Sequence, residues 1–213
     1  MLRPDYSPHH QSHTKRNFDL AIGGMILASS WPAELLGLGY LKSIMPGQAG
    51  YFRQLREGIN VVKLRTMTDG AEAQRVYTRS NDRIPTATAR FIRDIRIDEL
   101  PQARSVIRGD MSVVGFRPLP QAGKEQYRDH LSAKEFGLWE WSRSGPVKPG
   151  LSGPAQLATF DMETMDSDFC QAAAEADIRN AREASLSGDV SIVLQTANLI
   201  TGEVIDHTKQ ALT

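Results

Sequence analysis

Two adjacent acids near the middle of the chain, Asp98 and Glu99, are the residues best suited to catalysis. Arg93 and Arg96 precede this pair, and Arg117 follows it beyond a short apolar segment. Several cations could therefore converge on one anionic ligand beside two carboxylates. This combination suits phosphoryl transfer, because one carboxylate can attack phosphorus or hold Mg²⁺ while arginines and the metal neutralise phosphate oxygens.

Helix capping is the alternative explanation of the same pair. Acids are preferred at the start of a helix, where the helix dipole stabilises negative charge. The spacing of apolar residues between 100 and 107 predicts a helix with Asp98 as its N-cap and Gly109 at its end. Capping would account for an isolated acidic pair, but the nearby arginines favour a ligand site.

Other catalytic classes lack support in the sequence. The chain contains no GxGxxG, GxxxxGKS/T or HExxH motif, which argues against dinucleotide, P-loop and zincin sites. Its single cysteine, Cys170, excludes an internal disulfide, and no Cys/His cluster suits zinc. His130 and His207 stand in no recognisable nucleophile context. The carboxylates therefore remain the best candidates.

The composition is that of an ordinary globular protein. Of 213 residues, 40% are hydrophobic and 23% are charged, and 25 basic residues balance 25 acidic ones. A chain of this length predicts one domain. Because the formal charge is zero, there is no overall attraction to nucleic acid, so we expect no nucleic-acid partner and only a local basic site.

The N-terminal region predicts a membrane-associated segment. Residues 1–16 combine Pro, Ser and three His without an apolar period and predict a flexible arm, in which metal binding by the histidines is the less favoured alternative. Residues 17–45 are largely apolar, but the uncharged run over 20–33 has only 14 residues. A spanning helix needs about 20 apolar residues, so a simple span is not expected.

Pro32 indicates a different arrangement of this segment. Proline bends or ends a helix, and Lys15, Arg16 and Lys42 flank the apolar region as basic anchors. We therefore expect a re-entrant membrane helical hairpin with Pro32 at its bend and both ends on one side of the bilayer. A pair of glycine-rich core helices is the alternative.

The remaining residues, 46–213, are expected to form a catalytic domain at the aqueous interface, which the family resemblance given below places in the cytoplasm. Residues 51–67 are typical of two short strands, or of a strand and a helix, joined by a turn at residues 58–60. Residues 87–95 are typical of an amphipathic helix and 111–114 of a buried strand. The polar residues 68–86 predict a loop, and the C-terminal tail predicts helices. The expected fold class is α+β, mostly α: a single compact domain with the N-terminal hairpin and a short β element.

The order of these motifs resembles the bacterial sugar transferase family, the monotopic polyprenyl-phosphate phosphoglycosyl transferases of the undecaprenyl-phosphate sugar phosphotransferase type. The motif-bearing segments are KRNFDL (15–20), PGQAGYFRQ (46–54), LRTM (64–67), DELPQARSVIRGDMSVVGFRP (98–118) and VKPGLSGPAQ (147–156). DELPQ followed by GDMSVVG is the most specific part of this match.

The resemblance implies an enzyme that passes a sugar 1-phosphate from a nucleoside diphosphate sugar, usually a UDP sugar, to polyprenyl phosphate. It implies release of UMP, a requirement for Mg²⁺, a place on the cytoplasmic face of the bacterial inner membrane, and a role in starting exopolysaccharide or glycoconjugate assembly. Besides its two substrates, membrane lipid is the expected partner, and a homo-oligomer is left open. The particular sugar is not predicted.

The resemblance also assigns residues. Asp98 is implied to be the nucleophile that forms a covalent phosphosugar intermediate, and Glu99 is implied to help hold the metal, so both are expected metal ligands. Basic residues on or beside the motif positions are candidates for phosphate contacts: Lys63, Arg65, Arg93, Arg117 and Lys148.

Three residues depart from the family pattern. Trp31 stands where a serine precedes the break proline, Glu34 falls in sequence expected to face lipid, and Phe116 replaces the first proline of GPRP. These departures motivate the other function considered, a non-catalytic membrane-associated interaction protein that retains the fold. The intact Asp98–Glu99 pair favours the enzyme.

Overall fold

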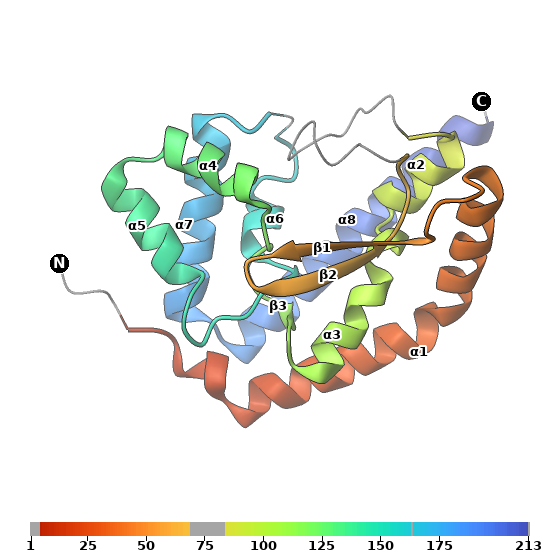
Figure 1. Cartoon of the computed structure of the whole chain (residues 1–213). Coiled ribbons are helices and arrows are strands. Elements are labelled where there is room, and N and C mark those ends of the chain that lie inside the picture. Colours follow the sequence, from red (N-terminus) through yellow and green to blue (C-terminus); the bar gives the residue numbers. More distant parts are fainter. Residues whose placement is uncertain (1–4, 69–83, 163, 213) are drawn as a thin grey trace.

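The structure is a computed structural model that describes residues 5–68, 84–162 and 164–212 (Figure 1). In these ranges the chain is mostly helical, with two sheets of two strands each. The predicted class, α+β and mostly α, agrees with this content. The loop expected over residues 68–86 lies mostly outside the described residues.

A single long helix, α1 (His13–Ile44), replaces the two helices predicted on either side of Pro32. Pro32 lies inside α1 without ending it. A proline removes one backbone hydrogen-bond donor, and we attribute the continuity of the helix to the packing of its buried face against the domain. Figure 1 shows α1 running along the bottom of the domain and then curving upward at the right of the view. The prediction of two separate helices is therefore corrected, and re-entry into one leaflet stays a prediction.

One face of α1 packs against the rest of the domain. By length and composition the helix could cross a membrane, and 22% of its most apolar window is buried. The buried residues recur every three or four positions along most of the helix. They are Lys15, Asp19, Gly23, Ser30, Glu34, Gly37 and Leu41.

Close packing explains a glycine in this apolar helix. A Cβ placed on Gly23 would lie 3.0 Å from Cγ1 of Val106 in α3 (Ala103–Arg108), so a larger residue would force the helices apart. Gly23 therefore reflects close contact between α1 and α3, whereas a Cβ on the neighbouring Gly24 would meet nothing within 4 Å.

Glu34 faces the domain and does not face lipid. Its side chain is 2% exposed, its Oε1 accepts a hydrogen bond of 2.8 Å from the Tyr51 hydroxyl, and Arg104 Nη1 lies 2.9 Å from the same oxygen. The carboxylate is thus paired inside the protein, which removes the cost of placing an unpaired charge in lipid.

Residues 5–12 pack on the domain, although the sequence predicted a flexible arm over residues 1–16. The Tyr6 ring stacks on Trp141 with 4.5 Å between ring centroids, and the Tyr6 hydroxyl donates to the Trp141 carbonyl oxygen over 2.8 Å. Ser7 is buried, and a short 3-10 helix, η1 (Pro8–Gln11), leads into α1. Aromatic stacking and buried polar contacts therefore order this segment.

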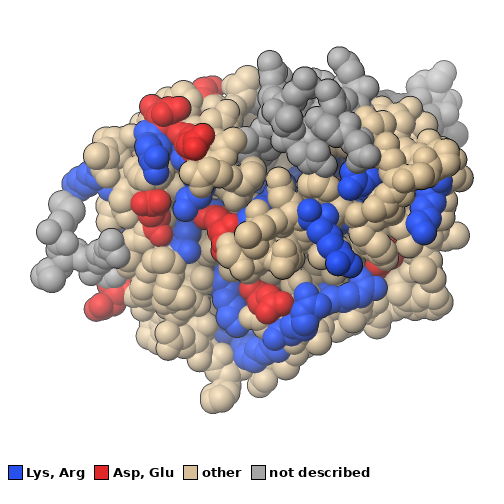
Figure 2. All heavy atoms as spheres, viewed as in Figure 1, with Lys and Arg blue, Asp and Glu red and all other residues tan. Residues whose placement is uncertain are grey.

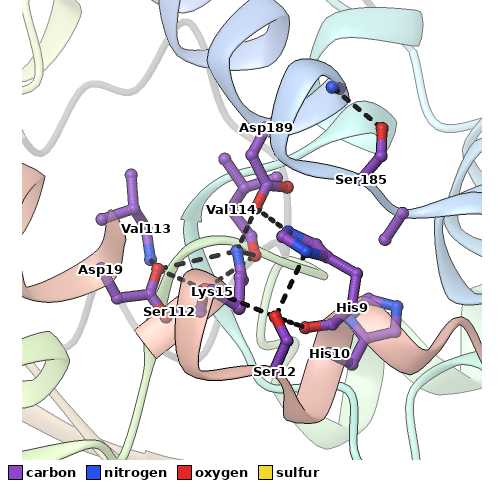
Figure 3. Close-up of polar contacts among 12 residues, drawn as sticks. His9, His10, Ser12, Lys15, Asp19, Ser112, Val113, Val114, Ser185 and Asp189 are labelled. Atoms are coloured by element: carbon purple, nitrogen blue, oxygen red, sulfur yellow. Dashed lines mark hydrogen bonds and ion pairs between the residues drawn. The ribbon is translucent and has the colours of Figure 1, made fainter. Parts of the chain in front are cut away.

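A buried ionic cluster joins the start of α1 to α8 (Leu186–Leu212), as Figure 3 shows. Lys15 Nζ lies 2.8 Å from Asp189 Oδ2 and donates a 3.0 Å hydrogen bond to the Val114 carbonyl oxygen. His9 Nε2 lies 3.0 Å from the same Asp189 oxygen (Figure 3). The His9 ring is therefore paired with Asp189. The His10 ring is also held within the protein, since its Nε2 lies 3.0 Å from the carbonyl oxygen of Asn180.

The first sheet is an antiparallel hairpin. Strands β1 (Tyr51–Arg56) and β2 (Ile59–Leu64) pair from Tyr51–Leu64 to Arg56–Ile59. Glu57 and Gly58 form the turn with φ of 45° and 83°, a left-handed geometry that glycine adopts without strain. The hairpin agrees with the first of the two predicted arrangements, two strands joined by a turn.

The second sheet joins two distant motifs. Strands β3 (Ser112–Val114) and β4 (Gly150–Ser152) pair in parallel. A Cβ on Gly115 would lie 2.1 Å from the Lys148 carbonyl oxygen, so the two segments approach as closely as their backbones allow. The GDMSVVG and KPG motifs, separate in sequence, therefore form one structural unit.

Helices complete the domain on both sides of the sheets. One group contains α4 (Gln121–His130), α5 (Ala133–Ser142), α6 (Pro154–Ala158) and α7 (Ser167–Glu183). Its apolar core includes Trp139, Phe169 and Cys170. Near the other end, α2 (Ala87–Asp94) buries Ala89 and Ile92 and leads into the residues that carry the acidic pair.

Candidate active site

Asp98 and Glu99 lie within a short 3-10 helix, η3 (Ile97–Gln102), so Asp98 is not the helix N-cap predicted from the sequence. Arg96 precedes η3 with a φ of 62°, a left-handed backbone that non-glycine residues rarely adopt. The Glu99 amide donates a 3.1 Å hydrogen bond to the Arg96 carbonyl oxygen and closes the turn. Local strain at Arg96 thus accompanies the placement of the acidic pair.

Glu99 is surrounded by cations from three parts of the chain. Lys63 Nζ from β2 forms an ion pair with Glu99 Oε1. Arg117 Nη2 lies 3.4 Å and Arg96 Nη1 lies 3.6 Å from the same oxygen. Burial alone would raise the pKa of Glu99, but Lys63, Arg117 and Arg96 hold it well below its usual value. Glu99 is therefore a fixed negative charge.

Asp98 has the opposite environment. Its residue is 2% exposed, and its Oδ1 has no hydrogen-bond partner among the described residues. Burial raises the pKa of Asp98 to about 6; Glu99 adds to the increase, while Lys63 and two nearby arginines oppose it. A carboxylate oxygen without a hydrogen-bond donor is a stronger nucleophile than one that accepts a hydrogen bond, which suits Asp98 Oδ1 to attack phosphorus.

A narrow cavity beside Glu99 is lined by five polar or charged residues together with Val61, Pro118, Gly150 and Leu151, and Asp98 is not part of its lining. Lys63, Glu99 and Arg117 contribute to it, with Arg56 and Gln102. Burial lowers the pKa of Lys63 to about 8, although Glu99 opposes the shift. The Gln102 Nε2 is also buried without a hydrogen-bond partner among the described residues. The sequence analysis did not assign Arg56 or Gln102, although Gln102 belongs to the DELPQ motif.

Arg117 is held in place by a second buried network, which the sequence analysis missed. Arg143 Nη2 donates a 2.6 Å hydrogen bond to the Arg117 carbonyl oxygen and another of 2.6 Å to Glu57 Oε2. Glu57 Oε2 also accepts a 2.9 Å hydrogen bond from the Leu119 amide. Arg143 and Glu57 together thus hold the backbone from Arg117 to Leu119. No periodicity or motif spacing marked Arg143 beforehand.

Phe116, one of the departures from the family pattern, belongs to this network. The Arg143 guanidinium lies 4.4 Å from the centroid of the Phe116 ring, which is 4% exposed. The aromatic ring therefore packs beneath the cation that orients Arg117.

The structure brings together only some of the predicted phosphate-binding residues. Lys63 and Arg117 contact Glu99, and Arg93 at the end of α2 acts electrostatically on Asp98. Lys148 is exposed and donates a 2.8 Å hydrogen bond to the Gly109 carbonyl oxygen. Arg65 lies in a different hollow, described below, and does not line the cavity beside the acids.

The two acids could hold Mg²⁺ together with the phosphate groups of a substrate. Mg²⁺ is commonly held by one or two carboxylates together with substrate phosphates. The unpartnered Asp98 Oδ1 could supply one such oxygen, and Glu99 is the second candidate. Among the described residues no three His, Cys, Asp or Glu side chains form a cluster, so the protein alone supplies too few ligands for a closed cage.

A model of the family described as "Bacterial sugar transferase" matches residues 10–203. The chain belongs to the bacterial sugar transferase family. The matched region contains both acids and all five predicted phosphate-binding residues. The family predicted from sequence motifs is therefore confirmed.

Curated relatives support the same assignment. The "UDP-glucose:undecaprenyl-phosphate glucose-1-phosphate transferase" of Caulobacter vibrioides is 36% identical over 193 residues, which cover 85% of this chain and 67% of that protein. The Escherichia coli K12 protein of the same name is 33% identical over 85% of this chain but only 39% of its own length. An Aeromonas hydrophila "UDP-N-acetylgalactosamine-undecaprenyl-phosphate N-acetylgalactosaminephosphotransferase" is 29% identical over 87% of this chain and 43% of that protein. This sugar transferase chain therefore corresponds to only part of its longer relatives.

Proposed function

We propose that this protein transfers a sugar 1-phosphate from a UDP sugar to polyprenyl phosphate, through a covalent phosphosugar intermediate on Asp98. The observation that carries the proposal is the contrast between the two acids: Glu99 is paired with cations, whereas Asp98 is buried with an unpartnered oxygen. The printed names of the relatives describe phosphoglycosyl transferases that use undecaprenyl phosphate, which supports this class of enzyme.

The first step is a displacement at the phosphorus that carries the sugar. An Asp98 carboxylate oxygen forms a bond to this phosphorus, and the bond to the bridging oxygen of the diphosphate breaks. UMP leaves with that oxygen and its electron pair. Lys63 and Arg117 would bind phosphate oxygens, because both side chains line the cavity beside the acids.

The second step regenerates the carboxylate. A phosphate oxygen of polyprenyl phosphate attacks the same phosphorus, the bond to Asp98 breaks, and a polyprenyl diphosphate sugar is released. Because phosphate is already anionic near neutral pH, this nucleophile needs no general base of its own.

Asp98 and Glu99 are the residues that would hold Mg²⁺. When bound, the metal neutralises charge on the donor diphosphate and on its leaving group. The cations around Glu99 keep this residue ionised, so it remains competent as a ligand.

Membrane attachment through α1 is part of the proposal. The helix is long and apolar, most of its apolar window is not buried, and the acceptor is a lipid. A cytoplasmic location is expected because nucleoside diphosphate sugars are made there.

The test is a screen of UDP sugars for UMP release by the full chain in lipid with polyprenyl phosphate and Mg²⁺. Wild type should be active with at least one donor, and Asp98→Asn should be inactive. Asp129→Asn is the matched control, because Asp129 is exposed on α4 and lies outside the motif-bearing segments. Absence of turnover with every donor, from folded protein in lipid, would instead support a non-catalytic interaction protein.

A further inference from the structure

A second basic hollow lies between the end of α1 and the start of β1. Its lining consists of Leu38, Lys42, Ala49, Gly50, Tyr51, Arg53 and Arg65. Three of these residues are cations and none is an acid. Figure 2 shows basic side chains over this part of the molecule.

The cations in this hollow are incompletely matched by the protein. Arg65 is anchored, since its Nε donates a 3.0 Å hydrogen bond to the Ala49 carbonyl oxygen and its guanidinium lies 5.5 Å from the Phe52 ring centroid. The side chains of Lys42 and Arg53 are exposed and form no ion pair or hydrogen bond with any residue that the structure describes. Like charges in one hollow repel one another, so an anion there would be favourable.

Glu34, an acid that contacts the lining of the hollow through Tyr51, is already paired. Tyr51, which lines the hollow, donates its hydroxyl hydrogen bond to Glu34, and Glu34 is paired with Arg104. Glu34 therefore does not neutralise Lys42 or Arg53. The positive charge of the hollow therefore favours binding of an anion from outside the protein. Arginine and lysine side chains are typical ligands of phosphate.

An apolar stripe on α1 leads into the same hollow. Trp31 and Leu35 are 55% and 56% exposed, Leu38 lines the hollow, and Lys42 follows. Successive members are separated by four, three and four residues, which places all four on one face of a helix. A row of exposed apolar side chains thus leads to a positively charged hollow. This arrangement is complementary to a molecule with a hydrocarbon chain and an anionic head group.

We propose that this hollow binds the phosphate group of a membrane lipid, with the lipid chain lying along Trp31, Leu35 and Leu38. The phosphate would contact Lys42, Arg53 and Arg65. The same chemistry is offered by an anionic bilayer phospholipid and by a polyprenyl phosphate, and the experiment distinguishes these sources. The hollow shares no lining residue with the cavity beside Glu99, so the inference does not depend on turnover.

Binding is measured with the full chain in neutral detergent, titrated in separate arms with phosphatidylglycerol, polyprenyl phosphate, phosphatidylcholine and inorganic phosphate. We expect wild type to bind one or both anionic lipids more tightly than phosphatidylcholine or inorganic phosphate. The double variant Lys42→Gln/Arg53→Gln should weaken that binding about tenfold or more, because each basic residue near a lipid surface contributes measurably. The control Lys134→Gln/Arg179→Gln removes the same charge from exposed positions of α5 and α7 and should bind like wild type.

A second matched pair tests the stripe. Leu35→Ser should weaken binding, whereas Leu36→Ser, a neighbour that is 76% exposed but lies off the stripe, should not. A loss confined to the phosphatidylglycerol arm identifies a bilayer lipid, and a loss confined to the polyprenyl phosphate arm identifies the acceptor. The proposal is overturned if the charge variant binds both lipids like wild type, if inorganic phosphate binds as tightly as the lipids, or if both leucine variants behave alike.

Discussion

The carboxylates of Asp98 and Glu99 are adjacent in the chain, but only Glu99 is paired with cations. Its Oε1 lies against Lys63 and 3.4 Å from Arg117 Nη2, while Asp98 Oδ1 lacks a hydrogen-bond partner in the described part of the chain. The contrast gives the two acids different tasks: Glu99 organises the cations, and Asp98 remains available to react. It also predicts opposite effects of two neighbouring isosteric substitutions.

Asp98→Asn should stabilise the protein at pH 7.5. The folded-state pKa of Asp98 is raised to about 6 from 3.8, so ionisation above pH 6 opposes folding. Replacing the ionised group by a neutral one should therefore raise the free energy of unfolding by an amount on the order of 1–3 kcal/mol. The gain should shrink as the pH falls from about 6 and should disappear near about pH 3, below the ordinary pKa of 3.8, where Asp98 is protonated in both states. Thermal unfolding of the two proteins across this pH range measures it.

Glu99→Gln should have the opposite effect, because it leaves Lys63 buried without its partner. Breaking such a pair costs about 3–5 kcal/mol when the remaining charge is fully buried, and less at the 13% exposure of these two side chains. The melting temperature should therefore fall for Glu99→Gln and rise for Asp98→Asn. Changes of the same sign in both variants would contradict the assigned division between the acids.

The rate of adduct formation should depend on pH in a bell-shaped manner. Below about pH 6 the Asp98 carboxyl becomes protonated and loses its nucleophilic electron pair, so the rate falls. Above about pH 8 Lys63 loses the charge that binds phosphate and balances Glu99, so the rate falls again. Single-turnover rates from pH 5 to 9.5 give both limbs.

Lys63→Arg provides the control for the alkaline limb. Arginine stays charged throughout this range, so this limb should weaken or vanish while the acid limb persists. A rate that is constant from pH 5 to 7 would contradict the role assigned to Asp98.

Arg143 should act as a positioning residue for Arg117. Arg143→Lys keeps the charge but cannot bridge the Arg117 carbonyl oxygen, Glu57 and Asp177 together. We expect about a tenfold or greater loss of kcat/KM for the donor, with a rise in KM, because small displacements of a binding group are costly. Arg182→Lys, at an exposed cation–π contact, is the control. Unchanged donor kinetics in Arg143→Lys would refute this role.

Both ends of α1 should lie on the same side of the membrane. Lys15 near its start and Glu34 in its second half are each buried in ionic contacts with the same domain, so neither end is free to cross a bilayer alone. Single cysteines at Thr14 and Gln48 should therefore react together with an impermeant thiol reagent in sealed vesicles. Labelling from opposite sides would exclude the re-entrant arrangement.

The fold was predictable where the sequence pattern is local. The glycine turn indicated the hairpin of β1 and β2, and the apolar residues Phe91, Ile92 and Ile95 indicated an amphipathic helix. Of these three only Ile92 is buried, and Ala89 is the other buried residue of α2. The continuous α1 was not predictable, because a proline usually ends a helix and its retention here depends on packing against distant residues. The order of residues 5–12 likewise depends on Trp141, which is remote in sequence.

The site was predictable to the extent that a motif marks it. Lys63 and Arg117 were predicted to lie with the acidic pair and do contact Glu99, whereas Arg65 was predicted to lie with them and lines a separate hollow. Lys63 and Arg65 are only two residues apart, but β2 ends at Leu64 between them, and the sequence does not mark this end. Arg143 and Glu57 were missed, since only the folded chain brings a hairpin turn beside the end of α5.

The most direct test of the account is the intact mass of the full-length protein after mixing with UDP sugars and Mg²⁺ in the absence of polyprenyl phosphate. The account predicts that wild type gains the mass of one sugar phosphate while UMP is released, and that later addition of polyprenyl phosphate removes this mass. Asp98→Asn should gain nothing. An active enzyme that never acquires the adduct, or an Asp98→Asn protein that turns over normally, would contradict the account and show that transfer proceeds without a bond to Asp98.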